Sequence, residues 1–167
     1  MDGISLLLVL LTCSLVPLII YSSFNRDVEK PALFYSLILF MQMALVGVFV
    51  AFDGFLFYLF WELALLPIWF ICLLWGGGDR ARITFKFFVY TLTGSLFMLA
   101  ALIYVYLHTE GNHSFDINAL YDAAKNMNGN EQSWVFWGLF LAFAIKIPIW
   151  PFHTWQPDTY TSSPTQG

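Results

Sequence analysis

The 167-residue chain is 59% hydrophobic and only 11% charged, with a formal net charge of −4. A soluble domain usually carries about 25% charged residues, so this composition excludes an ordinary water-soluble domain and favours a membrane protein. The negative net charge and the lack of a basic cluster in the sequence exclude nucleic acid as a partner. The N-terminus MDGISLLLVLL has an acidic residue where a cleaved signal peptide carries a basic one, so we expect no signal peptide.

Apolar segments follow one another along the chain, at residues 4–21, 32–52, 55–75, 87–107 and 134–150. The first four are long enough to cross a hydrocarbon core of about 30 Å as helices. The fifth has an uninterrupted part of only about 21 Å before Pro148 and Pro151 break it. The pattern predicts an all-α, multi-pass transmembrane helix bundle with about five spanning segments, the last one broken. We expect residues 1–167 to form a single transmembrane domain.

Basic residues gather in the loops that follow the first and third segments, at Arg26, Lys30, Arg80, Arg82 and Lys86. Only Lys125 lies in a loop on the opposite side. The positive-inside rule therefore predicts that the loops after the first and third segments face the cytoplasm or matrix, and that the N-terminus and the 108–132 loop are external. The expected location is the cell inner (plasma) membrane, or the mitochondrial inner membrane for an organellar protein.

The external loop is polar and contains one predicted helix, over residues 117–127, with Asp116 as its N-cap. His108 and His113 lie in this loop, but two histidines without further convergent ligands do not make a metal site. We therefore expect no metal and no cofactor. Near the end of the chain, Ser163 followed by Pro164 predicts the start of another helix.

Glu62 is the first sign of function, because it lies in the middle of the third apolar segment, too far from either end to reach water. A charged side chain at such a depth costs about 2.5–3.5 kcal/mol on insertion scales, and ionisable residues there are usually functional. The alternative is a protonated glutamate that only holds helices together. Pro67 favours a functional role, because it removes the helical hydrogen-bond donor of the Leu63 carbonyl and leaves a polar opening beside Glu62.

Lys146 is the second intramembrane charge, and it lies directly before the two prolines of the fifth segment. Pro148 should release the carbonyl of Ala144, and Pro151 should release that of Ile147. Free carbonyls at a broken helix are typical of ion sites in transporters. A lysine near a helix end can also extend harmlessly to the interface, which is the alternative.

Glu62 and Lys146 are predicted partners, because an unpaired intramembrane charge is much more costly than a paired one. His153 lies in the broken region, where it could transfer protons near neutral pH. A packing histidine is an equally good interpretation of that residue. On the fourth segment, small and hydroxyl residues predict close helix packing, at Thr91, Thr93, Gly94 and Ser95.

Three stretches, FWELALLPIWF, TFKFFVYTLTGSLFML and AFAIKIPIWPFHTWQPD, resemble the proton-channel (antiporter-like) subunits of NADH-quinone oxidoreductase, respiratory complex I. Within them, the chain is most similar to the subunit M or chain 4 family. The resemblance extends to subunits of Mrp-type sodium/proton antiporters and membrane-bound hydrogenases. It covers nearly all of the chain and implies helices three to seven of about fourteen, so that the chain resembles a fragment or a split gene product of the family.

By this resemblance, Glu62 matches a glutamate on helix five, Lys146 a lysine on the discontinuous helix seven, and His153 a histidine in the same break. The three are expected to transfer protons in a half-channel with a Glu62–Lys146 switching pair. The chain would be a membrane subunit of a proton-translocating NADH:quinone oxidoreductase, without redox chemistry of its own. Its expected partners are other complex I membrane subunits, neighbouring antiporter-like subunits among them, the lipid bilayer and protons. The alternatives are an Mrp-type antiporter subunit and a non-conducting structural or assembly subunit.

Overall fold

The computed structural model describes residues 2–23, 27–111 and 113–164. In these residues every regular element is a helix: α1 (Gly3–Ser22), α2 (Pro31–Val50), α3 (Gly54–Leu63), α4 (Leu65–Trp75), α5 (Arg80–Leu107), α6 (Ile117–Asn126), α7 (Gly129–Lys146), the 3-10 helix η1 (Phe152–Trp155) and α8 (Gln156–Ser162). The prediction of an all-α protein is confirmed.

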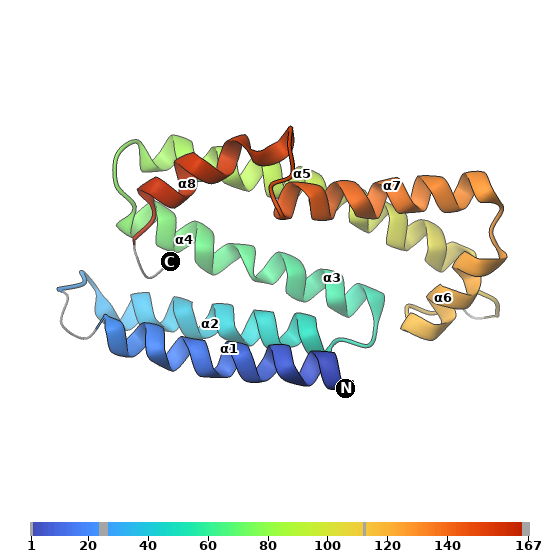
Figure 1. Ribbon diagram of the computed structural model, residues 1–167, viewed down its shortest axis with the longest axis horizontal. Helices are drawn as coiled ribbons and strands as arrows, with labels where there is room; N and C mark the ends of the chain where they lie inside the picture. Colours follow the sequence, from blue (N-terminus) through green and yellow to red (C-terminus); the bar gives the residue numbers. More distant parts are fainter. Residues whose placement is uncertain (1, 24–26, 112, 165–167) are drawn as a thin grey trace.

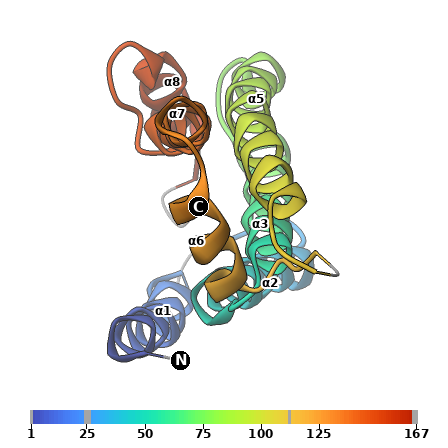
Figure 2. The ribbon, with the colours of Figure 1, turned by 90° about the vertical axis from the view of Figure 1, so that its right-hand side faces the viewer.

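The long helices lie side by side in a bundle, with α1 and α2 at one edge and α7 and α8 at the other (Figure 1). Seen from the end, α5, α3 and α2 form a row, and α7 and α8 follow one another beside α5 (Figure 2). Four stretches of the described chain are long and apolar enough to cross a membrane: Gly3–Ser22, Pro31–Val50, Gly54–Trp75 and Arg80–Leu107. These are the first four predicted segments, and α7 is the shorter fifth, so the multi-pass architecture is confirmed.

The third membrane-length stretch is two helices instead of one, because α3 ends at Leu63 and α4 begins at Leu65. Ala64 keeps helical backbone angles, and its N–H donates to the Phe60 carbonyl at 3.1 Å, so the direction of the chain is nearly preserved. Pro67 lies in the first turn of α4, where a missing N–H costs least. The interruption therefore falls at Ala64, two residues after Glu62.

Two helices start earlier than predicted. Because α5 begins at Arg80, the basic residues expected in the preceding loop lie on its first two turns. Helix α7 begins at Gly129, four residues inside the predicted 108–132 loop, because Asn128 and Glu131 form a capping box. Such a box supplies hydrogen-bond acceptors for the first backbone N–H groups of the helix, which have no acceptor in a preceding turn.

The predicted cap of the short helix after residue 116 is confirmed. The Asp116 carboxylate accepts hydrogen bonds from the N–H groups of Asn118 and Ala119, and α6 follows. Asp53 caps α3 in the same way, through the N–H of Leu56 at 2.9 Å. The two caps lie next to each other, since they form an isolated antiparallel bridge in which the Gly54 N–H donates to the Phe115 carbonyl at 2.7 Å. The α2–α3 turn is thereby joined to the start of α6.

The prediction that Ser163 begins a helix is wrong, because Ser163 is the C-cap of α8. Its backbone is extended, and its hydroxyl donates to the Thr159 carbonyl at 2.7 Å. A residue before proline favours extended backbone, so a Ser-Pro pair can end a helix as well as start one. Residues 165–167 lie outside the described part of the chain.

Helices α5 and α7 approach each other closely at two glycines. A Cβ atom on Gly94 would lie 3.0 Å from the Ile145 side chain, and one on Gly138 would lie 3.2 Å from the Cβ of Ala101. Thr91, Gly94 and Ser95 are buried, as the prediction of a tightly packed fourth segment requires. Thr93 is exposed, and its hydroxyl bonds to the Val89 carbonyl of its own helix, so this residue takes no part in the packing.

Replacing Asn128 by Ala should lower the stability of the protein by about 1 kcal/mol, the usual cost of losing an N-cap. The effect should appear as a lower thermal midpoint in detergent. Asn130→Ala is the matched control, because Asn130 is an exposed asparagine two residues further along the chain. Equal midpoints for the two variants would contradict the capping role.

Candidate functional site

Glu62 lies in the last turn of α3, where its carboxyl group is partly withdrawn from the surface. Its Oε1 atom is buried and has no hydrogen-bond partner among the described residues. The side chain lines a cavity of 300 Å³ together with Tyr58, Leu65 and Phe88. An unsatisfied buried carboxylate oxygen is costly, which is typical of a functional group and untypical of a structural one.

Two polar side chains surround this carboxyl group. The Ser95 hydroxyl of α5 donates to the Leu92 carbonyl at 2.9 Å and lies within reach of both the Glu62 carboxyl and the Tyr58 hydroxyl. Neither Ser95 nor Tyr58 belonged to the predicted site. They give Glu62 neutral polar neighbours besides the charge of Lys146.

Lys146 is the last residue of α7, and its side chain turns toward α3. The ammonium group lies over the ring of Trp61, 4.3 Å from the ring centroid. The described residues contain one ion pair shorter than 4.0 Å, between Lys86 and Asp158. Glu62 and Lys146 are therefore neighbours without a direct ion pair, and Trp61 holds the lysine.

Lys146 also lines a second cavity, of 280 Å³, which is bounded by α2, α4, α5 and the segment after the break. Four hydroxyl-bearing side chains contribute to its wall: Thr91, Thr159, Tyr160 and Ser163. Most of the wall is apolar, but a space of this volume with several hydroxyl groups has room for water molecules. Leu65 lines both this cavity and that of Glu62, so the two charges face adjacent spaces separated by one buried leucine.

The break after α7 differs from the prediction in its hydrogen bonds. The carbonyl of Ala144, expected to be free, accepts the N–H of Ile149 at 2.8 Å. The carbonyl of Ile145 accepts the indole N–H of Trp155 at 3.0 Å. The Ile149 N–H thus takes the place of the donor that Pro148 lacks, and the Trp155 indole takes the place of the Ile149 N–H. The prediction of a free Ala144 carbonyl is therefore wrong, and Trp155 is a site residue that the sequence analysis missed.

His153 lies in η1, half-buried, and its Nδ1 atom is buried without a hydrogen-bond partner in the described chain. It lines neither the cavity of Glu62 nor that of Lys146. The structure thus brings the two charged residues of the predicted site together and leaves the histidine to one side.

A polar cluster fastens the segment after the break to α5. Lys86 donates to the Asp158 carboxylate at 2.8 Å and to the Thr154 carbonyl at 2.7 Å, and the Thr154 hydroxyl bonds to Tyr90 at 2.9 Å. The Lys86 and Asp158 side chains are 36% and 50% exposed, so their attraction is weak and the cluster mainly fixes position. Lys86 is expected in a loop from the sequence, so its contact with the segment after the break is not predicted.

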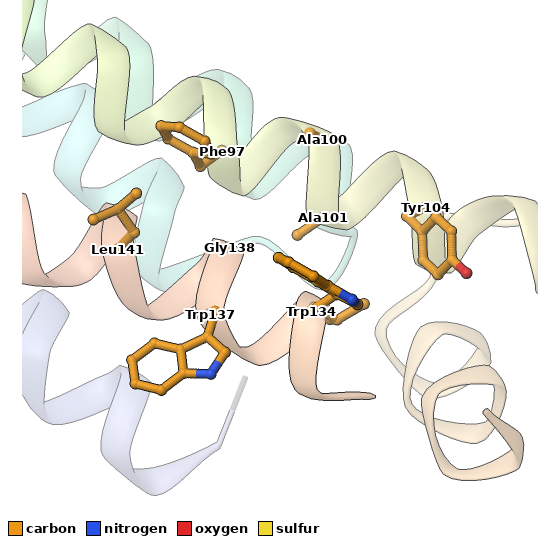
Figure 3. A pocket seen from close by; sticks show the side chains of 9 residues that line it. Phe97, Ala100, Ala101, Tyr104, Trp134, Trp137, Gly138 and Leu141 are labelled. Carbon is orange, nitrogen blue, oxygen red and sulfur yellow. The ribbon is translucent and has the colours of Figure 1, made fainter. Parts of the chain in front are cut away.

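An apolar cavity of 440 Å³ lies between α5 and α7, on the side of Trp134 and Trp137. Figure 3 shows Phe97, Ala101 and Tyr104 of α5 facing α7 across it. None of its lining residues is charged at neutral pH, and both indoles are largely exposed. This cavity offers no path for a proton, so we do not count it as part of the candidate site.

Comparison with known proteins gives a consistent result. The model of the family described as "NADH:quinone oxidoreductase/Mrp antiporter, TM" matches residues 51–167. The chain is 42% identical over 170 residues to F(420)H(2) dehydrogenase subunit M of Methanosarcina mazei, covering 99% of this chain and 34% of that protein. It is 40% identical over 166 residues to NADH-quinone oxidoreductase subunit M of Rickettsia conorii, covering 99% and 33%. The chain therefore spans about a third of the length of these relatives.

Solved structures agree. A chain of respiratory complex I from Thermus thermophilus with bound NADH matches with a TM-score of 0.82 and 33% identity, over 98% of this chain and 33% of that one. A chain of the archaeal membrane-bound sulfane sulfur reductase matches with a TM-score of 0.83, and its 21% identity shows the fold alone. The present chain belongs to the transmembrane family of NADH:quinone oxidoreductases and Mrp antiporters.

Proposed function

We propose that this chain forms part of a proton half-channel in the membrane part of a respiratory oxidoreductase. The observation that carries the proposal is the placement of Glu62 and Lys146 in adjacent cavities, both partly withdrawn from the surface and not ion-paired. Two opposite charges that lie close together without a contact pair can change their separation, and that change alters the proton affinity of each. His153, in the broken segment, is proposed as a further proton-transfer residue.

The proposed parent assembly is of the complex I type. Relatives are named as subunits of NADH-quinone oxidoreductase and of F(420)H(2) dehydrogenase, which differ in electron donor. The proton transfer proposed for this chain is acid–base chemistry at Glu62 and Lys146, which is the same for either electron donor. Other membrane subunits of the complex, among them neighbouring antiporter-like subunits, are the proposed partners.

We propose one transmembrane domain in a cell inner (plasma) membrane, or in a mitochondrial inner membrane for an organellar protein, with the basic ends of α2 and α5 on the cytoplasmic or matrix side. The excess of Lys and Arg at these ends supports this orientation. The 108–132 region, with α6, is then external. Trp134 and Trp137, which are 78% and 59% exposed near the start of α7, are suited to the outer interface.

Glu62→Gln, introduced into the full parent protein in its assembled complex, should abolish or strongly reduce proton pumping. The amide keeps the shape of the side chain but cannot exchange a proton, and Glu62→Asp should retain part of the activity. The measurement is proton uptake by membrane vesicles during quinone reduction, with assembly checked on native gels. Glu110→Gln is the control, because Glu110 is an exposed residue beyond the end of α5. Full pumping by assembled Glu62→Gln would contradict the proposed function.

A further inference from the structure

Trp61 is the residue that Lys146 contacts in this structure. The lysine ammonium lies 4.3 Å from the centroid of the indole, and no carboxylate of the described chain lies within 4.0 Å of it. Attraction between a cation and an aromatic face is strongest for tryptophan and increases when water is excluded. The contact therefore stabilises a charged lysine at a distance from Glu62.

The indole is itself held in place from two sides. Phe57, one helical turn earlier, lies 5.7 Å away between ring centroids, and Phe143 of α7 meets the indole edge-on at 5.3 Å. Phe143 lies three residues before Lys146, so the helix that supplies the lysine also supplies a ring that packs against Trp61. A fixed ring presents its face to the ammonium at little entropic cost.

Glu62 follows Trp61 directly in the sequence, so both lie on the last turn of α3. Consecutive helical residues project about 100° apart, so one lysine on a neighbouring helix can reach either of them. The lysine side chain is flexible, with a four-carbon stem. Rotation about the bonds of this stem is the movement that would carry the ammonium from the indole face toward the carboxylate.

We propose that Trp61 is a positioning residue that gives Lys146 a second resting place, so that the lysine alternates between the indole of Trp61 and the carboxylate of Glu62. The inference rests on the proposed function and extends it. In the structure the lysine occupies the Trp61 position, and the Glu62 Oε1 atom is left without a partner. If the attraction between the indole face and the ammonium is weakened, the lysine stays at Glu62 and no longer alternates between the two positions.

Site-specific incorporation of tryptophans with one, two and three fluorine atoms tests this, because fluorine withdraws electron density from the ring face and changes its shape little. At position 61 in the assembled parent complex, protons pumped per electron pair should fall stepwise with each fluorine. Loss of the full cation–aromatic attraction corresponds to a change on the order of tenfold in the equilibrium of Lys146 between the Trp61 and Glu62 positions. Trp61→Phe should retain more pumping than Trp61→Leu, since it keeps an aromatic face.

Trp69 is the matched control, because its ring packs against Phe70 and Phe88 and meets no cation in the described chain. The same fluorine series at position 69 should leave pumping unchanged. A flat series at position 61, or equal falls at both positions, would overturn the role of Trp61. If Glu62→Gln stops pumping in that same preparation, the proposed function survives that result. Full pumping by Glu62→Gln would contradict both the proposed function and the role of Trp61.

Discussion

Replacing Glu62 by Gln and Lys146 by Ala together should reduce proton pumping by little more than either replacement alone. Residues that act as one unit show strongly non-additive losses, because the first replacement already disables the unit. The two side chains face adjacent cavities, with Trp61 in contact with the lysine, which places them within the range of such coupling. We expect a coupling free energy of about 1–3 kcal/mol.

The measurement is proton pumping coupled to quinone reduction in membrane vesicles, for the two single variants and the double variant. Lys125→Ala is the control for loss of a lysine, because Lys125 is exposed on α6 and lies over the Tyr121 ring. It should leave pumping near its normal level. Losses that multiply independently would show that Glu62 and Lys146 each contribute but do not act as a pair.

Gly94→Leu should strongly reduce the amount of assembled complex. At this position even a Cβ atom would lie 3.0–3.4 Å from three atoms of the Ile145 side chain. A leucine must therefore separate α5 from α7, and overpacking of this kind costs about 1–3 kcal/mol or more. Displacement of Ile145 also displaces Lys146, the next residue, so pumping by the remaining complex should fall as well.

Two substitutions separate the effect of packing from that of losing a glycine. Gly94→Ala should be tolerated better, since it needs Ile145 to move by only a few tenths of an ångström. Gly129→Leu should have little effect, because a Cβ atom there meets nothing within 4 Å. Assembly on native gels and thermal midpoints measure all three. Normal assembly of Gly94→Leu would show that this helix contact is unimportant.

Much of the fold follows from local patterns in the sequence. Apolar runs predicted the membrane-length helices, and Asp116 predicted the start of α6, because hydropathy and capping depend on residues close together in the chain. The starts of α5 and α7 were missed for the opposite reasons. The first turns of α5 are polar, so hydropathy gave no signal there, and the Asn128–Glu131 capping box lay in a segment already interpreted as loop.

The candidate site was predicted only in part. Glu62 and Lys146 are conspicuous in the sequence because charges are rare in apolar segments. Trp61 and Trp155 are not conspicuous, since aromatic residues make up 20% of the chain and only the tertiary packing shows which of them meet a charge or a carbonyl. The Ala144 carbonyl was expected to be free because proline rules describe a regular helix, whereas the chain after Ile147 follows a sharper turn.

The bridge between the α2–α3 turn and the start of α6 has a mechanical consequence for Glu62. Backbone hydrogen bonds and the Asp53 cap fasten the first turn of α3 to the start of α6, while its last turn, which carries Glu62, meets the interruption at Ala64. A helix that is fixed at one end tilts most at the end farthest from the fixed point. Any tilt of α3 about its fixed first turn therefore bends the chain at the Ala64 interruption and displaces the last turn most, and that turn carries the Glu62 carboxyl group.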